Sequence, residues 1–503
     1  MPLPFKNLPN QIRVPLFYAE VNNSRANTAQ QPQRSWLIGQ MFTAGANAGA
    51  ATPSVPVICG GVAQAAQLAG SGSMLHLMAI AYFLNDPFGE VWLLPLADAG
   101  GSTAATGSLA FTHVATANGT LSLYIAGMLV TLPVLTTQTV NNLATALAAA
   151  VNAVPNLPVS AAVDGTNAFQ VNFTALNAGP GGNDIDLRLN YGGVRNGEST
   201  PAGLTTTFTA MSGGATPPSL TTGLANAGDK AYDFIVLPYT DSTSLNGLQA
   251  FLNDSTGRWS WQSRIYGHVF AAYRGTYGAL TTFGSGRNDQ HASIMGFYDS
   301  PTPSWVWAAA VAGAAAVSLR NFAPQPLQTL AIAGVLAPPL ASRFPLPERN
   351  TLLYDGISTF TVADDGTVAI ERLITTYQFN PYGQPDNSYL PVERMFQLMF
   401  VLRFLQIRIT SKFGRMALAD DGTRFAAGLP IVTPSILRAD QIAAYGELEF
   451  AGQVQNAEEF AEGLIVQRNF QNGIGDVNRI DVLWDGILTN QLNIFALLAM
   501  FSA

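Results

Sequence analysis

Apolar residues follow two periods along this chain of 503 residues. Short runs that alternate or are apolar throughout predict strands, and runs that repeat on one face every three to four residues predict helices. In the first hundred residues, strands are expected at 35–39, 55–59 and 90–95, with helices at 63–69 and from Ser71 or Ser73 to Leu84. Because strand, helix and strand follow one another, this region predicts a βαβ unit.

The same pattern resumes after residue 220 and continues to the C-terminal part of the chain. It predicts strands at 232–239, 267–272, 293–297 and 480–483, and helices at 241–252, 305–320 and 390–416. Two β-type runs, 358–362 and 367–376, flank Asp364-Asp365-Gly366. Asp-Gly supplies the positive φ angles of a tight turn, so these runs predict a hairpin.

The composition changes between Gly100 and Gly214, where lysine is absent and Gly, Thr, Asn, Ala and Ser dominate. Strand candidates there are 121–125, 128–134, 159–163, 169–173 and 185–189, interrupted by one helix at 139–153. The segment is predicted to be a small inserted β-rich domain.

Both ends of the chain have an apolar pattern without a neighbour in sequence to pair with. Near the N-terminus the apolar side of an alternating strand is formed by Ile12, Val14, Leu16 and Tyr18. Pro15 cannot donate to a ladder, which indicates an edge strand or a strand added to another sheet. An arm that folds back on its own domain is the alternative.

Near the C-terminus, residues 487–501 are apolar on both faces from Ile494 on, as in a strand covered on both sides. Periodicity alone does not distinguish this strand from a terminal helix. An isolated strand is not stable in water, so each end is expected to complete a sheet. The residues expected to make this contact are Leu492, Ile494, Phe495 and Leu497.

These patterns predict a multidomain chain of mixed α/β (α+β) class, long enough for about three domains. The expected parts are an N-terminal arm at 1–30, a discontinuous central α/β domain at 31–100 and 216–340, an inserted β-rich outer domain at 101–215, a C-terminal α/β domain at 341–485 and a C-terminal arm at 486–503.

Charged residues make up only 11% of the chain, against a usual fraction of about 25%. A free monomer uses surface charge to stay soluble and apart, so this deficit predicts a surface largely covered by partners. A tight monomer with a Ser/Thr/Asn surface is the alternative. The net charge of −8 argues against a general nucleic-acid binder. The apolar run at 305–319 is too short for the roughly 20 residues that a bilayer needs, and no signal peptide is expected.

Candidate catalytic chemistry is sparse. A single cysteine, Cys59, excludes an internal disulfide framework and is expected in the core. None of the four histidines belongs to a His-Glu-x-x-His motif, and His268 and His291 beside apolar runs are expected to be core or loop residues. No catalytic residue, metal site or cofactor is predicted, although carboxylates such as Asp299 and Glu371 could still meet through the fold.

One basic stripe stands out on the expected helix 390–416. At about 100° per residue, a narrow sector of that helix carries Arg394, Arg408, Lys412 and Arg415. The stripe is either a solvated face or a contact with an acidic partner.

A resemblance to a known family covers nearly the whole chain, from Ile12 to Ala503. The segment 350–386 looks like the conserved core of contractile phage tail sheath proteins of the Mu-like type, 12–27 resembles their N-terminal arm, and 490–499 resembles their C-terminus. The insertion is similar to the outward domain of these sheaths and is the least specific part.

The resemblance implies a structural subunit that stacks with copies of itself as hexameric rings around a tail tube. Arms exchanged between neighbours would join the rings, and contraction would drive the tube through the host envelope without nucleotide or membrane insertion. The implied partners are the tail tube, which the basic stripe would contact, and baseplate and tail terminator proteins. The implied location is the virion, after assembly in the host cytoplasm. The alternatives are a passive virion structural protein and a virion surface hydrolase built on one of the histidines.

Overall fold

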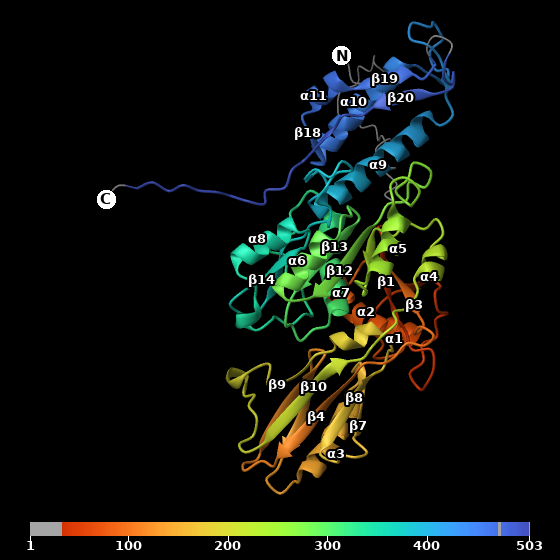
Figure 1. Ribbon diagram of the computed structural model, residues 1–503. Coiled ribbons are helices and arrows are strands. Elements are labelled where there is room, and N and C mark those ends of the chain that lie inside the picture. The colour runs from red at the N-terminus through yellow and green to blue at the C-terminus, as the bar shows by residue number, and fades with distance from the viewer. Residues whose placement is uncertain (1–32, 471–473, 502–503) are drawn as a thin grey trace, which may run out of the picture. The chain divides into compact units, whose positions relative to one another are not determined.

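The computed structural model describes residues 33–470 and 474–501 (Figure 1). The chain forms two compact units. The larger one contains residues 33–399, 449–455 and 486–501, and the smaller one contains 400–448 and 456–485. The mixed α/β class expected from the sequence is confirmed, whereas the expected domain boundaries stay a prediction.

A six-stranded sheet forms the centre of the larger unit, in the order β13-β12-β11-β1-β3-β2. Its strands are β1 (Ser35–Gln40), β2 (Val57–Cys59), β3 (Val91–Leu96), β11 (Phe234–Val236), β12 (His268–Arg274) and β13 (Ala292–Phe297). Neighbouring strands are parallel except for β2, which runs antiparallel to β3. Strands of such a sheet are covered on both faces, which is why their sequences read as apolar runs rather than alternations.

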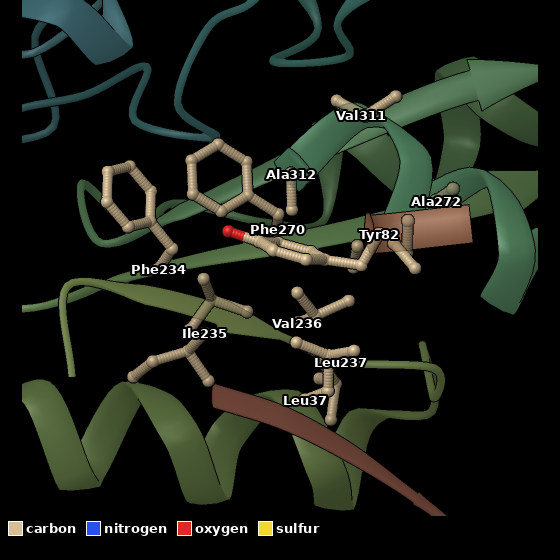
Figure 2. Close-up of a cluster of buried hydrophobic side chains, with 14 of the residues drawn as sticks. Leu37, Tyr82, Phe234, Ile235, Val236, Leu237, Phe270, Ala272, Val311 and Ala312 are labelled. Carbon is tan, nitrogen blue, oxygen red and sulfur yellow. The ribbon is translucent and has the colours of Figure 1, made fainter. Parts of the chain in front are cut away.

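The predicted βαβ unit is formed by β1, α2 (Met74–Asn85) and β3. Ser73 begins α2 because its hydroxyl accepts a hydrogen bond from the backbone N–H of His76. Helix α7 (Ser304–Asn321) packs on α2 and the sheet, and its small residues permit close approach. A Cβ at Gly313 would lie 2.7 Å from the carbonyl oxygen of Tyr82. Figure 2 shows the ring of Tyr82 near Phe234 and Phe270 in this core.

The remaining helices of this part are α1 (Val62–Ala69), α4 (Thr221–Ala225), α5 (Ser242–Leu252) and α6 (Tyr277–Ser285). The sequence pattern missed α4 and α6 and placed α1, α2, α5 and α7 to within a few residues. No helix in the described part of the chain is long and apolar enough to cross a membrane.

The segment between β3 and α4 builds a second core from two antiparallel sheets and one helix. The elements are β4 (Thr106–His113), β5 (Gly119–Ile125), β6 (Met128–Val134), α3 (Val140–Ala153), β7 (Val159–Val163), β8 (Gln170–Ala175), β9 (Leu187–Leu189) and β10 (Thr205–Ser212), with short 3₁₀ turns at η1 (Pro180–Asp184) and η2 (Val194–Asn196). Sheet β10-β4-β8-β7 includes two strands, β4 and β10, that the sequence pattern missed. Both are rich in Thr, Ser or Gly, which weakens a period-two apolar signal.

After the 3₁₀ turn η3 (Leu340–Ser342) come α8 (Leu346–Tyr354) and the predicted hairpin of β14 (Thr359–Val362) and β15 (Val368–Arg372). Gly366 in its turn has φ +89°, the conformation for which glycine was expected there. Helix α9 (Val392–Phe413) follows, with residues 392–399 in the larger unit and the rest in the smaller one.

The smaller unit packs α10 (Pro434–Phe450), whose last two residues belong to the larger unit, and α11 (Ala457–Gly463) with the hairpin of β19 (Ile465–Arg468) and β20 (Ile480–Leu483). Strands β16 (Ala417–Leu418) and β17 (Ile431–Val432) form a short parallel pair. Tyr445 stacks on Phe460 at 3.8 Å between ring centroids, and the Trp484 ring lies beside both. In the larger unit, β18 (Val454–Gln455) pairs antiparallel with β21 (Ile487–Leu488).

Candidate functional site

The C-terminal segment that follows β21 is the most exposed apolar part of the described chain. Residues 489–501, here called the tail, form neither helix nor strand (Figure 1). The expected strand at 487–501 is therefore formed within this chain only at Ile487–Leu488, because β18 offers a ladder of only two residues. Within residues 489–501, the large apolar side chains that are at least 69% exposed are Leu492, Ile494, Phe495, Leu497, Leu498, Met500 and Phe501. Contiguous exposed apolar side chains of this kind mark interaction sites.

The root of the tail, in contrast, is held by hydrogen bonds. The N–H of Thr489 donates to the carbonyl oxygen of Gln453 at 3.2 Å, and Gln328 donates through Nε2 to the carbonyl oxygen of Leu492 at 3.1 Å. The side chain of Gln397, fully buried on α9, donates to the carbonyl oxygen of Thr489 at 2.9 Å. The structure thus binds the backbone of Leu492, while the side chains of Leu492, Ile494, Phe495 and Leu497 are exposed. The N-terminal candidates Ile12, Val14, Leu16 and Tyr18 lie outside the described residues.

The basic stripe does not form one free face. Arg408 is buried and donates through Nε and Nη2 to the two carboxylate oxygens of Asp440, at 2.8 and 2.9 Å. It also donates to Glu447 at 2.9 Å, and Lys412 contacts Asp440 at 2.8 Å. Burial alone would raise the pKa of Asp440, but hydrogen bonds and charge from Arg408 and Lys412 outweigh it and hold that pKa below its ordinary value.

The other two residues of the stripe differ from this pair. Arg394, in the larger unit, donates to the backbone carbonyl of Ser388 at 2.6 Å, and burial lowers its pKa. Arg415 is exposed in the smaller unit. The acidic partners of Arg408 were missed from the sequence, although Asp440 and Glu447 lie two turns apart on one face of a predictable helix.

The histidines do not form a hydrolase site. His268 is buried, its Nε2 lies 2.8 Å from Oγ of Ser293, and burial holds its pKa well below the ordinary value. Among the described residues Nδ1 of His268 has no hydrogen-bond partner, so no carboxylate orients that ring as a catalytic triad requires. The carboxylate of Asp254 lies 2.9 Å from Nε2 of a different histidine, His291.

Other groups singled out in the sequence have structural roles. Asp299 and Glu371 do not meet, because arginines engage them separately: Arg188 contacts Asp299 at 2.9 Å and Arg349 contacts Glu371 at 2.8 Å. Cys59 is buried, and burial raises the pKa of its thiol. Within residues 33–470 and 474–501, no group of three or more His, Cys, Asp or Glu could hold a metal ion.

An ion pair and its hydrogen bonds connect the inserted β-rich segment to the central sheet. Arg274, at the end of β12, forms an ion pair with Asp184 and donates to the backbone carbonyls of Ser300 and Thr302 at 2.6 and 2.9 Å. The second carboxylate oxygen of Asp184 accepts from the N–H of Ser304 in the first turn of α7. Asp184 therefore caps a central helix from within the insertion.

Comparisons with known proteins agree on one family. Residues 213–376 match the phage tail sheath protein central domain. The Mu-like prophage FluMu tail sheath protein of Haemophilus influenzae is 38% identical over 499 residues, which cover 99% of each chain.

The matches among solved structures have low sequence identity and TM-scores below 0.5. The sheath tail protein of Desulfitobacterium hafniense is 12% identical with a TM-score of 0.45, over 95% of this chain and 97% of that chain. The sheath tail protein of Listeria innocua is 13% identical with a TM-score of 0.46, over 92% of this chain and 93% of that chain. A chain of the anti-feeding prophage baseplate is 10% identical with a TM-score of 0.46, over 98% of this chain and 100% of that chain.

Proposed function

This chain belongs to the phage tail sheath proteins of the Mu-like type, and from that premise we propose that it stacks as hexameric rings around a tail tube and contracts to drive the tube through the host envelope. It is a structural protein of a phage tail and therefore a virion component, not an enzyme. The rings, the contraction and assembly in the host cytoplasm are the proposed part.

The exposed tail is the observation that supports this proposal most directly. Its apolar side chains are largely exposed in the described part of the chain, and the backbone groups beside them can pair with an open sheet edge. A donated strand of about five residues makes on the order of five backbone hydrogen bonds, each worth roughly 1 kcal/mol net. We propose that Ile494, Phe495 and Leu497 enter a neighbouring subunit, and that the N-terminal arm of residues 12–18 does the same.

Exchanged arms would let the lattice change its geometry without coming apart. Ladder bonds between subunits persist while the faces of stacked rings repack, and better burial between rings in the contracted state would supply the work. The proposed partners besides other copies are the tail tube, the baseplate and the tail terminator.

Electron microscopy of the purified protein tests the function. Long striated sleeves are expected, and sleeves assembled around tube should shorten and widen when triggered. Protein that stays monomeric under every assembly condition, or forms closed shells, would contradict the sheath role proposed here.

The basic stripe is proposed to contact acidic groups on the tube through its exposed members. Arg415 is exposed, and Lys412 is half-exposed although it contacts Asp440, whereas Arg408 is buried and paired with Asp440 and Glu447. Exposed charge pairs are weak and screened by salt, which suits a contact that must release. Arg415→Glu should weaken co-assembly with tube by about two- to fivefold at low salt. Arg424→Glu, at another exposed arginine of the smaller unit, is the control, and equal co-assembly of both variants would remove the contact.

A further inference from the structure

The first residues of the tail are held by hydrogen bonds, and the residues from Ile494 on are not. Up to Leu492 the chain is held by the β18–β21 pair and by glutamine side chains. The N–H of Asn493 turns back to the carbonyl oxygen of Gln491 at 3.1 Å. From Ile494 to Phe501 the described residues make no hydrogen bond. An anchor therefore ends, and a free segment begins, at Asn493.

Gln397 is the centre of this anchor. Its side chain is fully buried, and its Nε2 donates to the carbonyl oxygen of Thr489 at 2.9 Å and to that of Gln453 at 3.4 Å. Its Oε1 accepts from Nε2 of Gln491 at 3.1 Å. One amide thus joins α9, the residue that precedes β18 and the tail root. An amide can donate and accept at once, whereas a carboxylate has no donor and an aliphatic chain has neither group.

The first two turns of α9 are themselves fixed to the central sheet. The carboxylate of Glu393 accepts from the N–H of Leu327 at 3.0 Å, and the ring of Phe396 stacks on Phe234 of β11 at 4.8 Å between centroids. Gln397 follows Phe396 directly. Force applied to the tail root would therefore be transmitted through Gln397 and its neighbour Phe396 to Phe234 in the six-stranded sheet.

We propose that Gln397 is the positioning residue that locks the tail root to the central sheet, so that force from a neighbouring subunit bends the chain at Asn493 instead of peeling β21 from β18. The role of the neighbour rests on the function proposed above. The lock itself is a property of the single subunit.

Hydrogen exchange on the unassembled full-length subunit tests the lock. In Gln397→Glu a carboxylate would face the carbonyl oxygens of Thr489 and Gln453, and in Gln397→Met all three hydrogen bonds would be lost. Exchange in peptides covering 486–492 should accelerate by about tenfold or more in either variant, with peptides of β12 and β13 unchanged. Gln406→Glu is the control, because Gln406 is an exposed glutamine of the same helix and should leave exchange at 486–492 unchanged.

A milder variant keeps the test valid if substitutions at the buried site unfold the protein. Gln491→Met removes one of the bonds of Gln397 at a partly exposed position and should accelerate exchange at 486–492 by a smaller factor. Unchanged exchange at 486–492 in folded Gln397 variants, or in Gln491→Met if those do not fold, overturns the lock. Because this readout needs no sleeves, a wild-type protein that never assembles would refute the proposed function and leave the lock standing.

Discussion

Two segments joined to the larger unit are poor in charge and are secured in opposite ways. The insertion between β3 and α4 buries its apolar residues in its own core and is joined to the sheet by Arg274 and Asp184. The tail has no core, and its apolar residues from Leu492 to Phe501 are exposed. A low content of charged residues therefore accompanies two different situations in this chain. The insertion buries its apolar residues in its own core, whereas the tail exposes them and is expected to need a partner.

The few charges of the insertion explain why it is firmly placed. Asp184 pairs with Arg274 and caps α7, while Arg188 pairs with Asp186 and reaches Asp299 near the end of β13. Tyr191 adds a hydrogen bond to the carbonyl oxygen of Ala337 at 2.8 Å. The root of the tail is held instead by neutral amides of the described residues, whose burial costs less than that of charges.

Removing the free part of the tail should have the largest effect. Truncation after Leu492 keeps β21 and the bonds of Gln397 but removes the exposed apolar residues, so the subunit should stay folded with a Tm within a few degrees of the full chain. Sleeve formation should be lost, as judged by electron microscopy and sedimentation. A polar tail of equal length, with Ile494, Phe495 and Leu497 changed to Ser, should fail as well. Normal sleeves from either variant would show that the tail links nothing.

Replacing the insertion by a linker should have an intermediate effect on stability, because it removes the partners of Arg274 and α7. A short Gly/Ser linker in place of 102–214 leaves Arg274 without its carboxylate and α7 without its cap, which should lower the free energy of unfolding by roughly 3 kcal/mol. Adding Arg274→Met should restore much of that loss, as measured by urea denaturation.

The rescued linker variant also tests whether the insertion is dispensable for assembly, as we expect for an outward decoration. It should form sleeves that are thinner in projection. A folded, soluble variant with Arg274→Met that never polymerises would show that the insertion takes part in the subunit contacts, and the contrast with the tail would no longer hold.

Which of these features the sequence could predict follows from the range of the interactions. Strands such as β1 and β13 were predictable because both faces are buried and their runs are apolar, and the β14–β15 turn because Gly366 needs positive φ. The edge strand β10 was missed because threonines dominate its exposed surface. The ion pair of Arg408 joins residues 32 positions apart on two helices, and no local pattern reports such a contact. The apolar tail was recognised, yet its cover cannot be read from one chain if a second copy supplies it.

The smallest effect is expected at Arg408, where charge fastens α9 to α10 within the smaller unit. Because interactions with Arg408 and Lys412 lower the pKa of Asp440 in the folded state, their stabilisation is complete above the ordinary aspartate pKa of about 3.9 and is lost as the pH falls through the lower folded value. Arg408→Met should cost about 1–2 kcal/mol at pH 7, less than a fully buried pair because Glu447 is partly exposed. It should also flatten the loss of stability below about pH 4, here called the acid limb.

Arg424→Met, at an exposed arginine, is the control and should change neither the stability at pH 7 nor the acid limb. An acid limb in Arg408→Met as steep as in the wild type would mean that Asp440 keeps its low pKa without this partner, and that charge does not fasten this part of the chain as it fastens the insertion.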